Sequence, residues 1–145
     1  MSKRGFAGVG LYNPKTESNI GGAMRAASCY AANFIAIQGH RIRRFPADTP
    51  RTYRHIPCFT TKNLISAVPH DCEPVAIEIV KGARPLENYT HPERAFYIFG
   101  PEDGSLPKEI LSKCRDIVYI DTNVCMNLAA TVNVVLYDRH MKEVK

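Results

Sequence analysis

The sequence predicts an α/β domain built around a largely parallel sheet. Short apolar runs alternate with helical segments, and short connections join them, which is typical of strand–helix–strand units. Polar loops follow three of these runs, at residues 13–25, 99–107 and 120–127. Because the carboxyl ends of parallel strands lie at one edge of the sheet, we expect these loops to meet there. A chain of 145 residues suits one core, so residues 1–145 should form a single domain.

The first strand–helix–strand unit lies near the amino terminus. Phe6–Leu11 is short and apolar and ends at Asn13-Pro14, so it predicts a buried strand. An alanine-rich helix should begin near Asn19, and Asn33–Ile37 is expected to form the second strand.

The first turns of this helix carry an unusual set of residues. Gly21 and Gly22 each lower helix stability by about 1 kcal/mol relative to alanine, which predicts that another group approaches the backbone closely. Asn19 and Arg25 lie near one end of the helix, where an amide and a guanidinium could converge on a polar or anionic group. A helix cap and a solvated arginine are an equally good interpretation from the local sequence.

A basic segment from His40 to His55 follows the second strand. It mixes arginine with aromatic residues and contains a single acidic residue, and its prolines exclude a long helix. Such a composition suits phosphate contacts and base stacking, so we expect it to bind RNA; a solvated surface loop is the simpler alternative. The arginines concerned are Arg41, Arg43, Arg44, Arg51 and Arg54.

The next strands lead to an acidic residue near a strand end. Ile56–Thr60 is expected to form a brief strand, and residues 61–68 a short helix. Pro74–Val80 predicts a buried strand that carries Glu78 near its carboxyl end. Ligands gather at that end of open α/β sheets, so Glu78 could accept a ligand hydrogen bond, or it could point to water.

A second acidic residue follows the strand expected at Ala95–Phe99. The chain breaks sharply at Gly100, and a helix is expected at Lys108–Ser112. Glu102 stands between this strand and this helix, where it could bind a ligand group or serve as a favourable charge before the helix.

The carboxy-terminal part predicts a strand at Asp116–Ile120, a polar turn, and a helix over Val124–Tyr137 that is apolar almost all round. Such a helix should be buried against more than one neighbour. Asn127 lies in its first turn, and burying a carboxamide without a partner costs about 1–3 kcal/mol. It should therefore either cap the helix or belong to a polar site.

Composition narrows the functional classes. The net charge of +5 is consistent with a polyanionic partner. The five cysteines are scattered without a Cys-x-x-Cys pair, which predicts reduced thiols and neither a disulfide framework nor a zinc site. The amino-terminal residues contain no signal-peptide core or spanning helix, so we expect a cytoplasmic protein without a membrane partner.

Together, the three loops resemble the three motifs of the SpoU-like SPOUT methyltransferases. The first motif corresponds to Asn19-x-Gly21-x-x-x-Arg25 and the second to Phe99-Gly100-Pro101-Glu102. The third corresponds to Ile120 followed by Cys125-Met126-Asn127, where cysteine stands in place of the usual serine. The resemblance covers nearly the whole chain and is closest to the small members that act on the tRNA wobble nucleotide.

This resemblance implies a deep trefoil knot at the carboxyl terminus, an obligate homodimer, and bound S-adenosylmethionine. The cofactor would be held by the loops after Glu78, Gly100 and Ile120, the last of which includes Cys125 and Met126. The sequence has no Gly-x-Gly-x-x-Gly fingerprint, which is consistent with a cofactor fold of this kind. The implied reaction is methyl transfer to a ribose 2′-hydroxyl of RNA, most simply tRNA, without a metal.

The resemblance also implies roles for four side chains. Arg25 corresponds to the catalytic arginine, Asn19 to the asparagine that helps to place it, and Glu102 and Asn127 to polar residues of the pocket. Arginine rarely gives up its proton, because its pKa lies above about 12, so orienting the target phosphate suits Arg25 better than acting as a general base.

Other functions are also compatible with the sequence. The chain could be an rRNA 2′-O-methyltransferase, a non-catalytic RNA-binding dimer that keeps the fold, or a small basic ribosome-associated protein without a cofactor. The presence of all four polar motif residues favours the enzyme over the non-catalytic dimer.

Overall fold

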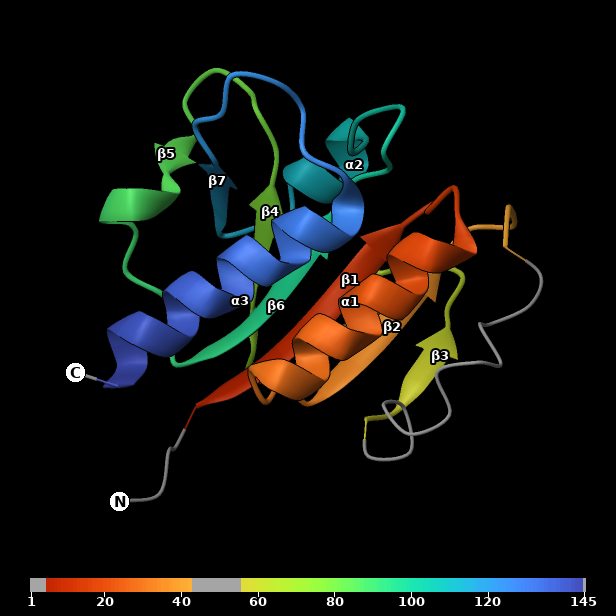
Figure 1. The fold of residues 1–145 in the computed structure, drawn as a ribbon, viewed down its shortest axis with the longest axis horizontal. Coiled ribbons are helices and arrows are strands. Elements are labelled where there is room, and N and C mark those ends of the chain that lie inside the picture. The colour runs from red at the N-terminus through yellow and green to blue at the C-terminus, as the bar shows by residue number, and fades with distance from the viewer. Residues whose placement is uncertain (1–4, 43–55, 145) are drawn as a thin grey trace.

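The computed structural model describes residues 5–42 and 56–144, and their core is a seven-stranded sheet with every pair of neighbouring strands parallel (Figure 1). The strand order is β3-β2-β1-β6-β4-β7-β5. The strands are β1 (Phe6–Tyr12), β2 (Phe34–Gln38), β3 (Cys58–Thr60), β4 (Glu73–Ile77), β5 (Arg84–Pro85), β6 (Arg94–Phe99) and β7 (Asp116–Tyr119). The helices are α1 (Glu17–Cys29), α2 (Lys108–Leu111) and α3 (Leu128–Val144), with short 3-10 helices η1 (Ile65–Ala67) and η2 (Leu86–Asn88). The expected α/β class with a parallel sheet is confirmed.

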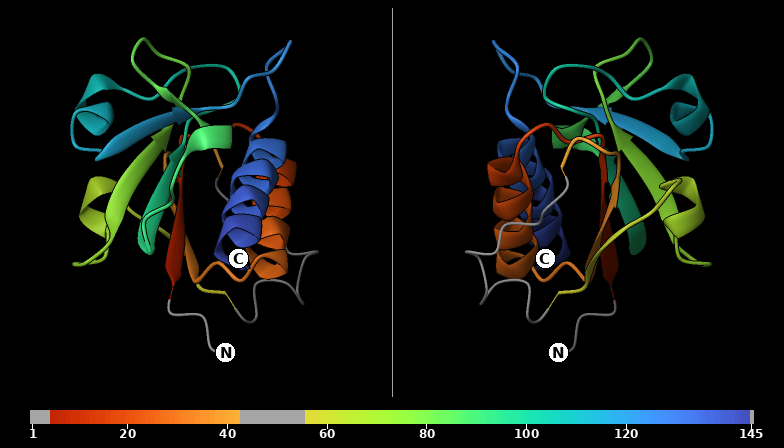
Figure 2. Two further views of the ribbon diagram at one scale, coloured as in Figure 1. Left: turned by 90° about the vertical axis from the view of Figure 1, so that its left-hand side faces the viewer. Right: turned by 90° about the vertical axis from the view of Figure 1, so that its right-hand side faces the viewer.

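Helices cover both faces of the sheet. Figure 2 shows α1 and α3 side by side on one face, and α2 and η1 on the other. Successive strand residues point to opposite faces, so Val9, Ile35 and Tyr97 pack beneath α1 and α3, whereas Phe34 and Phe96 belong to the core on the opposite face. The threading of a knot through the carboxy-terminal loops stays a prediction.

Most differences from the sequence expectations concern the ends of elements. Helix α1 begins at Glu17, two residues earlier than expected, because the Thr16 side chain accepts a hydrogen bond from the backbone of Asn19 and caps it. Helix α3 begins later than expected, at Leu128, and continues through charged residues to Val144. The expected helix at residues 61–68 is reduced to η1.

The segment between β4 and β6 contains β5 and η2, which the sequence patterns did not predict. The strand gives no signal in the sequence because it is only two residues long. It is defined by its pairing with β7 and not by any apolar run.

The two long helices pack at a distance that only glycine allows. A Cβ atom added at Gly22 would lie 2.6 Å from the Cβ of Ala129 on α3. The close approach expected at this glycine is therefore confirmed, and the approaching group is the first turn of α3. Contact between α1 and α3 brings two distant polar loops together at one edge of the sheet.

A buried polar cluster holds the second half of α3 against the rest of the protein. The Arg139 side chain is only 4% exposed. It donates hydrogen bonds to the carbonyls of Pro92 and Glu93, at 2.7 Å each, and to the Tyr97 hydroxyl at 2.9 Å. Nothing in the apolar pattern of the helix predicts this role.

His91 extends the cluster. Its Nδ1 lies 2.7 Å from the Tyr97 hydroxyl, and its Nε2 lies 2.7 Å from an Asp138 carboxylate oxygen. Asp138 also pairs with Lys142, which donates to two backbone carbonyls of the segment around η2. Burial lowers the pKa of His91 more than the neighbouring Asp138 carboxylate raises it.

We therefore expect the free energy of unfolding to decrease as the pH falls from about 7 to 5, because the unfolded chain takes up a proton on His91 that the folded protein resists. The stabilisation is fully present above the unfolded pKa of about 6.5 and is lost as the pH falls toward the lowered folded pKa. Urea unfolding of the wild type and of His91→Gln at several pH values measures it. The variant should show a flatter dependence, and equal slopes would contradict the assignment.

No helix among the described residues combines the length and the apolar character needed to cross a membrane.

Candidate active site

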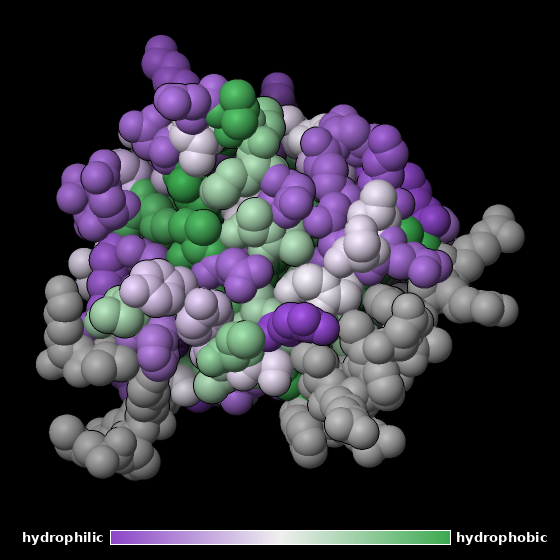
Figure 3. Space-filling model, in the orientation of Figure 1, coloured by the Kyte–Doolittle hydropathy of each residue, from purple (hydrophilic) through white to green (hydrophobic). Residues whose placement is uncertain are grey.

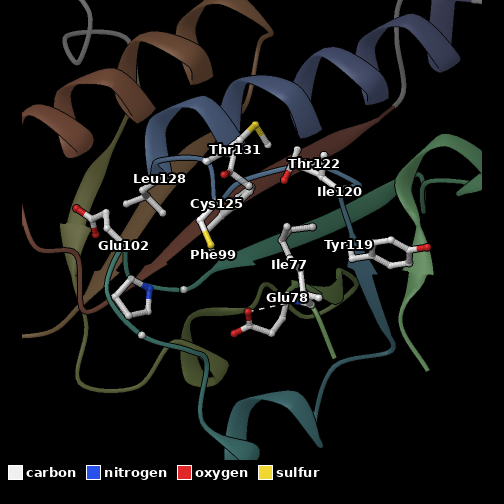
Figure 4. Close-up of a pocket in the computed structure, with 15 residues that line it drawn as sticks. Ile77, Glu78, Phe99, Glu102, Tyr119, Ile120, Thr122, Cys125, Leu128 and Thr131 are labelled. Carbon is white, nitrogen blue, oxygen red and sulfur yellow. Dashed lines mark hydrogen bonds between the residues drawn. The ribbon is translucent and has the colours of Figure 1, made fainter. Parts of the chain in front are cut away.

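A pocket opens at the carboxyl ends of β4, β6 and β7, where the first turns of α3 form one wall (Figure 4). In that view Glu102 lies at one end of the pocket and Tyr119 at the other, with Ile77 and Cys125 between them. The lining residues are Ile77, Glu78, Ile79, Phe99, Gly100, Pro101, Glu102, Gly104, Tyr119, Ile120, Thr122, Cys125, Met126, Leu128 and Thr131.

All the residues that were expected to hold the cofactor line this pocket: Glu78, Gly100, Ile120, Cys125 and Met126. Sequence reasoning missed the two threonines of the lining. Thr131 could have been found from helical spacing, because it lies three residues after Leu128 on α3. Thr122 lies in the polar turn after β7 and donates its hydroxyl hydrogen to the backbone carbonyl of Val124.

Glu102 joins the rim of the pocket to the start of α1. Its carboxylate accepts hydrogen bonds from the Asn19 side chain at 2.6 Å, from the backbone of Lys15 at 3.1 Å and from the Thr16 hydroxyl at 3.4 Å. Burial tends to raise the pKa of Glu102, but these hydrogen bonds outweigh it and hold the pKa below its usual value. Glu102 is therefore a carboxylate at neutral pH, next to the positive end of a helix dipole.

Asn19 connects all three polar loops. Its Nδ2 donates to Glu102, and its Oδ1 accepts from the backbone nitrogen of Ala129 at 3.3 Å. The expectation that the three loops meet at one edge of the sheet is confirmed by these two bonds.

Asn127 caps α3. Its Oδ1 accepts a hydrogen bond of 2.7 Å from the backbone nitrogen of Ala130, and the side chain is exposed. The capping interpretation of this residue is thus the one that the structure shows. Asn127 itself does not line the pocket, although Met126 and Leu128 on either side of it do. A role in the reaction stays a prediction.

Glu78 both faces the pocket and fastens a loop. It is the first residue after β4, and its Oε1 accepts a hydrogen bond of 2.7 Å from the backbone nitrogen of Leu106. The sequence left a ligand contact and a solvated charge as alternatives. The hydrogen bond from Leu106 shows a third role for Glu78, which is to hold the loop between β6 and α2.

Comparison with known proteins decides the family. Residues 7–137 match the model of the SpoU rRNA Methylase family. The chain belongs to this family. The resemblance seen in the three motifs is therefore confirmed, and the pocket lies where the second and third motifs of this SpoU family chain come together. No sequence among the curated proteins matches the chain.

Solved structures of SpoU proteins share the fold. The SpoU methyltransferase AviRb from Streptomyces viridochromogenes, in complex with AdoMet, has a TM-score of 0.85 and 17% identity, covering 100% of this chain and 60% of its own. The TrmH/SpoU tRNA modifying enzyme of A. aeolicus has a TM-score of 0.84 and 14% identity, with coverages of 99% and 77%. A structure described as giving insights into the 2-OH methylation of C/U34 on tRNA has a TM-score of 0.79 and 20% identity, with coverages of 97% and 91%. The chain thus spans 60% of the length of the first of these relatives.

Arg25, the remaining residue of the first SpoU motif, lies apart from the pocket of its own chain. It is exposed on α1 and makes no hydrogen bond or ion pair with any residue in the described part of the chain. Asn19 and Arg25 do not converge within one chain. Six residues of α-helix separate them by about 9 Å along the axis and place them on different faces.

The basic segment is only partly described. Arg43, Arg44, Arg51 and Arg54 lie outside the described residues, so their contact with RNA stays a prediction. Arg41 is described, and its guanidinium pairs with Asp103 in the loop after β6. Among residues 5–42 and 56–144, no group of three or more His, Cys, Asp or Glu side chains is placed to hold a metal ion.

Proposed function

We propose that this protein transfers a methyl group from S-adenosylmethionine to a ribose 2′-hydroxyl of RNA, with tRNA as the substrate. The observation that carries this proposal is the pocket at the carboxyl ends of β4, β6 and β7, which the second and third motifs line in a chain of the SpoU family. The AdoMet complex of AviRb and the relative associated with 2-OH methylation on tRNA support the cofactor and the reaction.

The residues of the pocket fit S-adenosylmethionine. Apolar side chains such as Ile77, Ile120 and Leu128 can pack against an adenine ring, and the surrounding loops offer backbone donors and acceptors. The carboxylates of Glu78 and Glu102 suit the positive charges of the sulfonium and the amino group. The bound cofactor would supply a methyl group on a sulfur that is already a good leaving group.

We further propose that the active form is a homodimer in which Arg25 serves the pocket of the partner subunit. The outer face of α3 carries three exposed apolar side chains, Val134, Tyr137 and Met141, which are 37%, 51% and 42% exposed. Figure 3 shows apolar residues among polar ones on this side of the molecule, over α3. A second copy would bury these side chains, and the exposed Arg25 guanidinium would then be free to orient an RNA phosphate.

Cofactor binding and RNA methylation test the proposal separately. Saturation with S-adenosylmethionine should release heat in calorimetry and raise the free energy of unfolding, by about 2.7 kcal/mol at a hundredfold excess over Kd. Mass mapping should find one 2′-O-methyl site in tRNA that is present in cells with the protein and absent from cells without it. If the missing site lies in rRNA instead, the substrate is rRNA and not tRNA. No heat and no stabilisation would reject the enzyme and favour a cofactor-free ribosome-associated protein.

A further inference from the structure

The loop between β6 and α2, residues 100–107, is fastened to the rest of the protein at three points. Leu106 donates its backbone hydrogen to Glu78, and Glu102 accepts hydrogen bonds at the start of α1. The third point is Asp103, the neighbour of Glu102, which pairs with Arg41 just after β2. Two adjacent carboxylates thus reach different partners, and this loop forms part of the pocket rim.

Arg41 makes three hydrogen bonds through one guanidinium. Its Nη1 and Nη2 donate to the two carboxylate oxygens of Asp103, each at 2.9 Å, and Nη2 also donates to the backbone carbonyl of Asn13 at 2.7 Å. This parallel two-bond geometry is the one for which a planar guanidinium is suited and an ammonium is not. The hydrogen bond to Arg41 lowers the pKa of Asp103 to about 2, so the pair is charged at all physiological pH values.

The Asn13 carbonyl is held in place by its own turn. Asn13 has a positive φ of 50°, and Gly39, with a φ of 141°, packs directly against it. A Cβ at Gly39 would lie 2.8 Å from the Cα of Asn13, so only glycine fits at this position. Arg41 therefore joins two fixed points, the turn that leads to α1 and the rim of the pocket.

We propose that Arg41 is a positioning residue, which connects the first residues of the basic segment to the rim of the methyl-transfer pocket through Asp103 and Asn13. This inference rests on the proposed function. To bind an RNA phosphate, Arg41 would have to give up its two charge-assisted hydrogen bonds to Asp103. Arg43 and Arg44, two and three residues further along the chain, are therefore better candidates for the phosphate contacts. Arg41 thereby sets where RNA bound by this segment stands relative to the cofactor.

The expected effects fall on the rate of transfer and not on stability. The Arg41 and Asp103 side chains are 33% and 43% exposed, and ion pairs at such solvent-accessible sites contribute little to the stability of the fold. Misplacing a bound substrate by a fraction of an ångström, in contrast, lowers a reaction rate steeply.

The test compares Arg41→Ala, Arg41→Lys, Asp103→Ala, the Arg41→Ala/Asp103→Ala double variant and the exchanged pair Arg41→Asp/Asp103→Arg. Each single variant should lower the single-turnover rate about tenfold, the double variant should be no worse, and the exchanged pair should recover part of the loss. The salt dependence of RNA binding and the unfolding midpoint should stay near those of the wild type.

Two reference variants calibrate these measurements. Arg115→Ala removes an equal charge from a 55% exposed side chain at the amino end of β7, away from the pocket, and should leave the rate unchanged. The double variant Arg43→Ala/Arg44→Ala should weaken RNA binding and reduce its salt slope by about two, as expected for phosphate contacts.

Opposite results would overturn the proposal. A salt slope reduced by about one in Arg41→Ala, with tighter RNA binding in Asp103→Ala, would make Arg41 a phosphate contact that Asp103 restrains. Amide hydrogen exchange provides a readout that needs no activity. The backbone of residues 101–106 should exchange faster in both single alanine variants, and unchanged exchange would reject the positioning role. If the wild type transfers no methyl group, the proposed function fails while the exchange result still decides the role of Arg41.

Discussion

An Arg25→Ala protein is expected to lose RNA methylation almost completely, by a factor of at least about 10², while its affinity for S-adenosylmethionine stays the same. Arg25 does not line the pocket of its own chain and has no partner among the described residues, so its removal should disturb neither the cofactor site nor the fold. Single-turnover methylation and calorimetric cofactor titration measure the two effects independently.

Variants on the same helix separate charge from geometry. Arg25→Lys keeps the positive charge but loses the planar fork, so it should recover only part of the activity. Ser28→Ala, at an exposed position of α1, should behave like the wild type. Activity in Arg25→Ala comparable to that of the wild type would remove this residue from the mechanism.

Complementation tests whether Arg25 acts across a subunit interface. A chain with Arg25→Ala keeps its pocket, and a chain with Cys125→Trp, which fills the pocket, keeps its arginine. If the arginine serves the partner's pocket, each mixed dimer has one site with both parts intact. About half of the dimers in an equal mixture are mixed and each has one working site of two, so the mixture should recover about a quarter of wild-type activity. If mixing recovers no activity, the arginine acts within its own subunit or the dimer does not form.

Arg139→Met is expected to lower the free energy of unfolding by about 1–3 kcal/mol, the cost of leaving a buried acceptor unsatisfied and the largest effect on stability of any single substitution considered. The methionine fills the space of the arginine stem but leaves the buried carbonyl of Pro92 without this donor, whereas the Glu93 carbonyl still accepts a hydrogen bond from the backbone nitrogen of Phe6. Because α3 forms one wall of the pocket in its first turns, weaker anchoring of its second half should also reduce the affinity for the cofactor.

Urea unfolding measures the change directly. Arg115→Ala is again the matched control, since it removes an arginine that is more than half exposed and should change stability by less than about 0.5 kcal/mol. A loss below about 1 kcal/mol in Arg139→Met would show that water or neighbouring groups replace the lost hydrogen bonds.

Sequence patterns placed the polar loops at one edge of the sheet, and the resemblance to the SpoU-like family assigned these loops to a cofactor pocket. Apolar runs marked the strands, and polar residues just after them had to lie at the carboxyl edge of a parallel sheet, because all such strands end on the same side. The resemblance named the loops after Glu78, Gly100 and Ile120, and all three residues line one pocket in the structure although they are far apart in the chain. The motifs carried the same information for Asn19 and Glu102, which the structure joins by a hydrogen bond.

Only the tertiary structure decided how the remaining polar groups are used. Arg41 was expected to contact RNA, but its guanidinium pairs with Asp103. Arg139 is buried, and it donates a hydrogen bond to the backbone carbonyl of Pro92. The sequence placed Asn127 near the start of a helix but left two roles open, a helix cap and a polar residue of the pocket. Because α3 begins at the next residue, Asn127 caps the helix. Local sequence reports which groups must find partners, because unpaired polar groups are costly. Which partners they find depends on segments that folding brings together from distant parts of the chain.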